Sequence, residues 1–204
     1  GIDRLSLLKF AALLHDTGKP STIKTDEDKI SFYQHWIVGA EINKDICRRL
    51  KMSAKSEEIV RRITENHMRP LYLTQLYYEN KAGLTRRAMY RFFRDSGDSG
   101  IEVLLSTADA MATKPHAPAT TAVSYKTVAE VIKRILDYYY NEYKQQRKRP
   151  IISGSYLIKK FNVEPGHVIG RILKDIEEHR GAGLLKNKND AINYIKENLH
   201  KWLE

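Results

Sequence analysis

The chain has 204 residues, enough to bury a sizeable core in one large or two modest domains, and its 42% hydrophobic and 29% charged residues are typical of a globular protein. Its single cysteine, Cys47, excludes an internal disulfide and favours a reducing, cytoplasmic compartment, and no apolar run approaches the length of a membrane span. The formal charge of +10 is compatible with a solvated basic surface or with a polyanionic partner such as nucleic acid.

Apolar residues recur at helical spacing along nearly the whole chain. In chain order, we expect helices over residues 4–16, 34–51, 53–67, 71–80, 85–95, 101–111, 123–146, 153–161, 165–179 and 190–203. The polar residues 24–28 are expected to form a loop. Because no segment alternates apolar and polar residues as a strand does, the predicted fold class is all-α, a helical bundle followed by a small C-terminal helical subdomain.

The first predicted helix carries an unusual end. Its apolar residues run directly into His15 and Asp16, after which Gly18 and Pro20 stop the helix. A carboxylate at a helix C-terminus faces the negative end of the helix dipole, at a cost of up to about 1 kcal/mol. A nearby cation would offset that cost, and a bound metal ion is the strongest candidate.

Three further residues with metal-ligating side chains lie on other predicted helices. His35 begins the second helix, His67 ends the third, and Asp109 lies between two alanines. A helical bundle can bring such side chains to one point, where imidazole plus carboxylate suits Mn, Fe, Ni or Zn and carboxylate with water suits Mg. The alternatives are histidines that cap or cover the surface and an ion pair between Asp109 and an arginine.

The segment Leu14–Pro20, with sequence LHDTGKP, resembles the signature of the HD superfamily of metal-dependent phosphohydrolases. Further segments resemble one branch of it, the HD region of bacterial tRNA nucleotidyltransferase and poly(A) polymerase family proteins. They are His35 with Gly39–Glu41, Cys47–Leu50, Asn66–Pro70, Thr85–Asp95, Ala108–Ala110, Ile152–Gly154 with Leu157, and Pro165–Leu173. The resemblance therefore covers nearly the whole chain.

The resemblance implies a fold, an activity and a set of site residues. It implies an HD-type helical bundle over residues 1–119, a connecting helix with a basic end over 120–150 and a helical subdomain over 151–204. The implied activity is hydrolysis of phosphoesters such as 2′,3′-cyclic phosphates by a divalent metal ion (Mg, Mn, Ni or Zn). The core ligands would be His15, Asp16 and Asp109, and His35 and His67 would complete the site or hold a second ion.

Catalytic roles follow for Asp16 and Lys19. By the resemblance, Asp16 holds the ion that activates water, and Lys19 neutralises the substrate phosphate, as its charge beside the His-Asp pair allows. The alternative for Lys19 is a solvated loop lysine.

The resemblance also implies RNA, tRNA in particular, or nucleotide phosphoesters as partners, in a cytoplasmic RNA-processing protein. The nucleotidyltransferase head of that family needs a glycine-rich turn and a pair of metal-binding carboxylates after a strand, and neither is present. We therefore expect that this chain alone adds no nucleotides and that the full-length protein has such a head.

The alternative function is a catalytically weak or inactive RNA-binding scaffold of the same family. Residues 1–14 contain no additional histidine of the kind that usually precedes the His-Asp pair in this family, and Trp36 follows His35 where an acidic residue is common. Either difference weakens metal binding.

Two clusters of basic residues are candidates for RNA contact. Arg86, Arg87 and Arg91 lie on one short predicted helix, interleaved with aromatic residues. They form either a phosphate-binding stripe or the solvated, ion-paired side of an ordinary amphipathic helix. Arg147, Lys148 and Arg149 form a dense basic cluster before Pro150, which suits RNA phosphates but also the negative end of a helix dipole.

Overall fold

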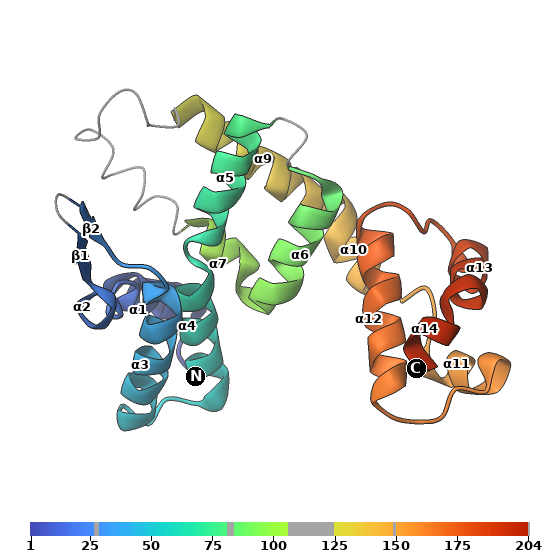
Figure 1. Ribbon diagram of the computed structural model, residues 1–204. Coiled ribbons are helices and arrows are strands. Elements are labelled where there is room, and N and C mark those ends of the chain that lie inside the picture. Colours follow the sequence, from blue (N-terminus) through green and yellow to red (C-terminus); the bar gives the residue numbers. More distant parts are fainter. Residues whose placement is uncertain (27–28, 81–83, 106–124, 149, 204) are drawn as a thin grey trace. The chain divides into compact units, whose positions relative to one another are not determined.

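The structure is a computed structural model that describes residues 1–26, 29–80, 84–105, 125–148 and 150–203 (Figure 1). Within these residues the chain is helical apart from one short hairpin and the connecting turns, which confirms the all-α fold class. The chain divides into two compact units, Gly1–Lys81 with Phe92–Ile132 and Ala82–Arg91 with Lys133–Glu204. No helix in the described part of the chain has the length and apolar composition needed to cross a bilayer.

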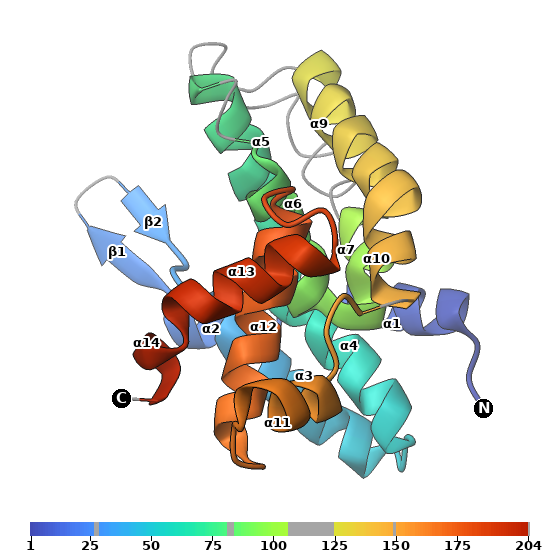
Figure 2. The same ribbon diagram turned by 90° about the vertical axis from the view of Figure 1, so that its right-hand side faces the viewer.

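The first unit is built on three helices that pack closely in pairs. Helices α3 (His35–Arg49) and α4 (Ala54–Asn66) run side by side, and α1 (Arg4–Leu14) packs on α4 (Figures 1 and 2). Side chains of Asp3 and Ser53 cap the N-termini of α1 and α4 by accepting backbone N–H bonds. The remaining elements that lie in this unit or enter it are α2 (Lys19–Thr22), α5 (Arg69–Glu79), α6 (Arg86–Ser96), the 3₁₀ turn η2 (Gly97–Ser99), α7 (Gly100–Leu105) and the first turns of α9 (Tyr125–Tyr138).

The core of this unit follows the predicted apolar stripes. Ile59, Val60 and Ile63 are buried on one face of α4, and α1 buries Leu7 and Ala11. These positions recur at three- and four-residue spacing, so each helix presents one continuous apolar stripe to its neighbours. The packing fixes the C-terminal ends of α1 and α4 relative to α3.

The prediction of a loop over residues 24–28, and of no strand in the chain, is wrong. Strands β1 (Lys24–Asp26) and β2 (Lys29–Ser31) form an antiparallel hairpin in which Thr25 pairs with Ile30. Each strand has three residues and all three of β1 are exposed, so the hairpin has no buried face. A strand this short and this polar leaves no alternating pattern in the sequence.

The long predicted helix 123–146 is interrupted by a π turn in the second unit. Helix α9 ends at Tyr138, the π segment η4 covers Tyr139–Tyr143, and α10 (Lys144–Lys148) follows. In a π turn, residues five apart lie above one another. Tyr138 and Tyr143 are both buried as a result, while Tyr140 is 54% exposed.

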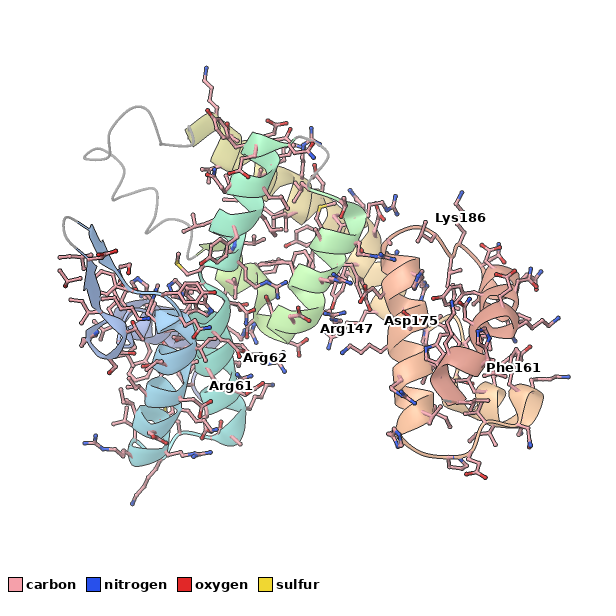
Figure 3. All side chains as sticks on the ribbon, in the orientation of Figure 1. Arg61, Arg62, Arg147, Phe161, Asp175 and Lys186 are labelled. Atoms are coloured by element: carbon pink, nitrogen blue, oxygen red, sulfur yellow. The ribbon has the colours of Figure 1, made fainter. Side chains whose placement is uncertain are left out.

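The C-terminal helices have a core of their own. They are α11 (Gly154–Phe161), α12 (His167–Gly181), α13 (Lys188–Asn198) and α14 (His200–Leu203). Ile172 and Ile176 of α12 are fully buried with Leu157 and Ile195, and the partly buried Phe161 packs against them (Figure 3). A capping box of Asn187 and Asp190 begins α13 at Lys188, two residues before the predicted start at Asp190.

Candidate metal centre

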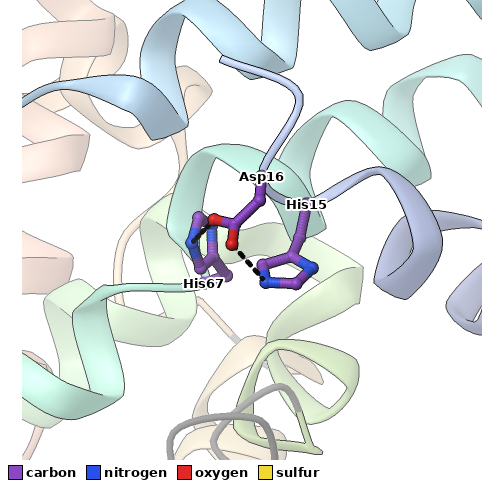
Figure 4. Close-up of side chains that lie close together, drawn as sticks. All are labelled: His15, Asp16 and His67. Atoms are coloured by element: carbon purple, nitrogen blue, oxygen red, sulfur yellow. Dashed lines mark ion pairs between the residues drawn. The ribbon is translucent and has the colours of Figure 1, made fainter. Parts of the chain in front are cut away.

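Three histidines and one aspartate converge at helix ends of the first unit. His15 and His67 are the C-cap residues of α1 and α4, and His35 is the first residue of α3. Asp16 Oδ2 lies 3.3 Å from Nε2 of His15. Asp16 Oδ1 lies 3.3 Å from Nε2 of His35 and 4.0 Å from Nε2 of His67. Figure 4 shows His15 and His67 on either side of the Asp16 carboxylate.

A backbone carbonyl three residues earlier fixes the orientation of each imidazole. The Nδ1 atoms of His15, His35 and His67 lie 2.7, 2.8 and 2.7 Å from the carbonyl oxygens of Ala12, Phe32 and Thr64. Two of these carbonyls belong to the last turns of α1 and α4, where they lack a helical partner. Because a carbonyl only accepts, each ring carries its proton on Nδ1 and turns the lone pair of Nε2 toward Asp16.

The spacing of the histidine Nε2 atoms and the Asp16 carboxylate fits a shared metal ion. Nε2 of His35 lies 3.2 Å from Nε2 of His67, and with both protons on Nδ1 neither atom has hydrogen to donate to the other. Two nitrogen ligands about 2.1 Å from one ion lie roughly 3.0–3.4 Å apart at octahedral to tetrahedral angles. His15, Asp16 and His67 offer ligand atoms that all lie within 4.8 Å of one another. The donor set and its spacing therefore suit a divalent cation.

The protonation states also suit a cation. Burial lowers the pKa of His67 to about 4, so this ring is neutral at pH 7 and its Nε2 carries a lone pair that can bind a cation. Partial burial by itself would raise the pKa of Asp16. The hydrogen bond and the positive charge of Lys19 act against burial, and the pKa of Asp16 lies below its usual value.

A buried asparagine connects the helices that carry these ligands. Asn43 of α3 is fully buried and donates from Nδ2 to the carbonyl of Leu14 at 3.0 Å and to Thr64 Oγ1 at 2.9 Å. Its Oδ1 accepts from the hydroxyl of Thr17 at 2.9 Å. Leu14 and Thr17 flank the His-Asp pair, and the carbonyl of Thr64 orients His67. One side chain thus ties the ends of α1 and α4 to α3.

Gly18 allows the close approach of the His-Asp loop to α3. A Cβ atom at this position would lie 2.1 Å from the carbonyl oxygen of His35 and 2.6 Å from the backbone nitrogen of Gly39. Any side chain other than hydrogen would therefore collide with backbone.

The centre lies in a cavity of about 650 Å³. Its walls combine the four converging residues with Lys19 and a group of mostly aromatic and apolar side chains: Ile30, Ser31, Phe32, Tyr33, Trp36, Met68, Leu71 and Tyr72. Lys19 Nζ lies 2.5 Å from Asp16 Oδ2 and is 39% exposed. The predicted phosphate-binding lysine is thus an ion-pair partner of the centre and lies at the cavity wall.

The structure brings together four of the five predicted metal ligands: His15, Asp16, His35 and His67. The fifth, Asp109, lies outside the described residues, so its part in the centre stays a prediction. Sequence reasoning missed Asn43, although an asparagine four residues after Gly39 on the same face of α3 was an available signal.

The arginines predicted to bind RNA lie in the second unit, where they form ion pairs. Arg86 pairs with Glu142, and Arg87 and Arg91 pair with Glu178. These ion pairs are compatible with the amphipathic alternative, and RNA contact by these arginines stays a prediction. In the other cluster, Arg147 is exposed (Figure 3), while Arg149 and the side chain of Lys148 lie outside the described residues.

Comparison with known proteins gives one family and two relatives. The HD domain family model matches residues 2–99, which include the whole converging centre. Over 200 residues, 97% of this chain, the sequence is 26% identical to the A-adding tRNA nucleotidyltransferase of Deinococcus radiodurans. Over 186 residues, 90% of the chain, it is 28% identical to the CC-adding tRNA nucleotidyltransferase of Thermus thermophilus. The chain covers only 42% and 38% of these two relatives.

Proposed function

We propose that this chain is the metal-dependent phosphohydrolase portion of an RNA-processing protein, because residues 2–99 match the HD domain family model and nearly all of the chain is similar to tRNA nucleotidyltransferases. The proposed substrates are phosphoesters such as nucleoside 2′,3′-cyclic phosphates. The two relatives are longer than the region that matches this chain. We propose that the additional part of such a protein includes the nucleotidyltransferase head.

One observation carries this proposal: three Nε2 lone pairs point at one carboxylate. His35 and His67 place their Nε2 atoms 3.2 Å apart while their Nδ1 protons are held by backbone carbonyls. Without a cation, these two lone pairs repel each other in a buried place, where electrostatic interactions are strong. The negative ends of the α1 and α4 dipoles point at the same position and favour a positive charge there.

The residues divide the chemistry as follows. His15, Asp16, His35 and His67 would hold the ion, with Asp109 as a further ligand. When bound, a divalent ion supplies Lewis-acid polarisation of the phosphoester and activation of water. Lys19, whose Nζ is 2.5 Å from Asp16 Oδ2, carries a positive charge beside the centre and can transfer its contact to a substrate phosphate.

The test combines metal binding with hydrolysis. Calorimetric titration with Mn²⁺, Ni²⁺, Zn²⁺ and Mg²⁺ should give saturable binding of at least one ion, and that ion should support hydrolysis of adenosine 2′,3′-cyclic phosphate. Asp16→Ala should abolish both. The matched control is Asp45→Asn, which changes a carboxylate on α3 whose side chain is 75% exposed. Failure of all four ions to bind, or full activity in Asp16→Ala, would refute the proposal.

The second candidate function, RNA binding, is favoured by the exposed basic residues on α10. Lys144 and Arg147 are both exposed near the end of this helix, and the two relatives are named as enzymes of tRNA. Phosphate contacts release counterions, so the logarithm of the affinity should fall with the logarithm of salt by about 0.7 per contact on single-stranded RNA. Arg147→Ala with Arg149→Ala should reduce this slope. Lys133→Ala, which removes a 76% exposed cation on α9, is the control.

A further inference from the structure

Beyond the four converging residues, the wall of the same cavity becomes aromatic. The rings of Tyr33 and Trp36 are 5.8 Å apart at an interplanar angle of 80°, and those of Trp36 and Tyr72 are 5.9 Å apart at 72°. Trp36 thus stands between two tyrosines in edge-to-face contact with both. This aromatic wall, Tyr33, Trp36 and Tyr72, comes from the segment before α3, the first turn of α3, and α5.

The aromatic wall is not part of the packed core. Tyr33 is 68% exposed and Tyr72 50% exposed, although both line the cavity. Tyrosine and tryptophan rings that remain exposed together in a cavity provide apolar faces with polar edges. Folding alone gains little from leaving such rings uncovered, and clusters of exposed apolar surface commonly mark ligand-binding sites.

The aromatic wall and the metal centre are directly adjacent. Trp36 follows His35 in sequence, and their ring centroids are 5.4 Å apart. Lys19 also lines the cavity, with its Nζ 5.6 Å from the centroid of Phe32. The cavity therefore combines a cationic or cation-binding group of residues with an adjacent aromatic group, within the reach of one small molecule.

A nucleoside phosphate has the same division, with a flat aromatic base at one end and a phosphate at the other. We propose that Tyr33, Trp36 and Tyr72 form a base-binding subsite that stacks on the nucleobase of the substrate while its phosphate lies at the His-Asp centre. This inference rests on the proposed function for the phosphate end and adds to it the recognition of the base. Stacking on aromatic side chains tolerates any base, because every base presents a π face.

The test measures binding of the base without metal or turnover. Trp36 and Trp202 are the two tryptophans of the chain, so a Trp202→Phe background leaves Trp36 as the fluorescent reporter. In the presence of EDTA, adenosine 3′-monophosphate should quench this fluorescence to saturation, whereas ribose 5-phosphate, which lacks a base, should not. Circular dichroism checks that the background protein is folded.

Tyr72→Ala supplies the matched comparison in the same background. Removing one stacking ring should weaken nucleotide binding by about fivefold to a hundredfold. Tyr78→Ala is the control, because Tyr78 lies on the same helix, is 57% exposed and is not among the cavity-lining residues. It should leave the affinity unchanged.

The outcomes separate this inference from the proposed function. Equal quenching by the nucleotide and by ribose 5-phosphate, or equal effects of Tyr72→Ala and Tyr78→Ala, would overturn the base-binding subsite. Loss of metal binding in calorimetry would instead overturn the phosphohydrolase proposal, and base-dependent quenching in EDTA would still support the subsite. With an active enzyme, Tyr72→Ala should lower kcat/KM for adenosine 2′,3′-cyclic phosphate but not for glycerol 1,2-cyclic phosphate, which has no base.

Discussion

Replacing Gly18 by alanine should damage both the stability of the first unit and the metal centre. The added Cβ would lie 2.1 Å from the carbonyl oxygen of His35, and such contacts are essentially never shorter than 3.0 Å. The loop and the start of α3 must therefore separate by at least 0.9 Å. Both atoms that meet the new methyl group most closely belong to the backbone of α3, so no side-chain rotation relieves the contact.

The expected magnitude follows from overpacking. An extra methyl group in a well-packed interior costs about 1–3 kcal/mol, and a contact with backbone belongs at the upper end of that range. A loss of about 3 kcal/mol lowers the melting temperature by roughly 10 °C in a unit of this size. The same shift separates Asp16 from His35, now 3.3 Å apart, so we expect metal affinity to fall at least about tenfold, as it does when residues that orient ligands are lost.

Thermal unfolding followed by circular dichroism and calorimetric metal titration measure the two effects. Gly170→Ala is the matched control, because a Cβ atom there would have no neighbour within 4 Å. This glycine lies inside helix α12, so alanine should stabilise the protein by about 0.5–1 kcal/mol. A Gly18→Ala protein with the melting temperature and metal affinity of the wild type would refute the close approach of loop and helix.

Three further substitutions test other parts of the structure. Asn43→Ala should lower the free energy of unfolding by about 2–3 kcal/mol in urea titration, because it leaves buried polar partners without their hydrogen bonds; a loss below 1 kcal/mol would contradict this. Hydrogen bonds and charges from Arg61 and Arg62 (Figure 3) lower the pKa of Glu58 to about 2, below its ordinary 4.5, so this interaction stabilises the protein at neutral pH and is lost as the pH falls from about 5 to 2. Glu58→Gln should cost less than about 1 kcal/mol at pH 7, since the carboxylate is 45% exposed, and the difference from wild type should disappear near pH 2; a constant difference would contradict the ion pairs. Tyr138→Phe should cost about 1 kcal/mol, because its buried hydroxyl donates to a backbone carbonyl at 3.0 Å, and an unchanged urea midpoint would exclude that bond.

Helix ends were the most predictable feature of the site. Gly18 and Pro20 mark the end of α1 in the sequence, and Ser53 marks the start of α4, because caps and breakers act over a few residues. The hairpin and the π turn were missed. Three-residue strands and a single wide turn change the positions of few side chains, so they leave no periodic signal.

The convergence of the candidate ligands was less predictable from spacing alone. His15, His35 and His67 are far apart in sequence, and only the packing of α1, α3 and α4 decides whether they meet. Residue types on separate predicted helices suggested the grouping, and the family resemblance made it more specific. Neither spacing nor family resemblance predicted the aromatic wall. Tyr72 contacts Trp36 from a different helix, and nothing in the sequence between them indicates that contact.

The arrangement of the polar residues preorganises the centre for an ion. Free imidazoles would adopt several ring orientations, and binding a metal would then require each one to be fixed. Here backbone carbonyls hold all three rings, and Asn43 holds the segments from which two of these carbonyls come. Preorganised ligands lose less conformational entropy on binding. Asn43→Ala should therefore weaken metal binding by about 10- to 100-fold although Asn43 offers no ligand itself, the effect typical of residues that orient ligands. Unchanged metal affinity in a folded Asn43→Ala protein would show that the rings are positioned without it.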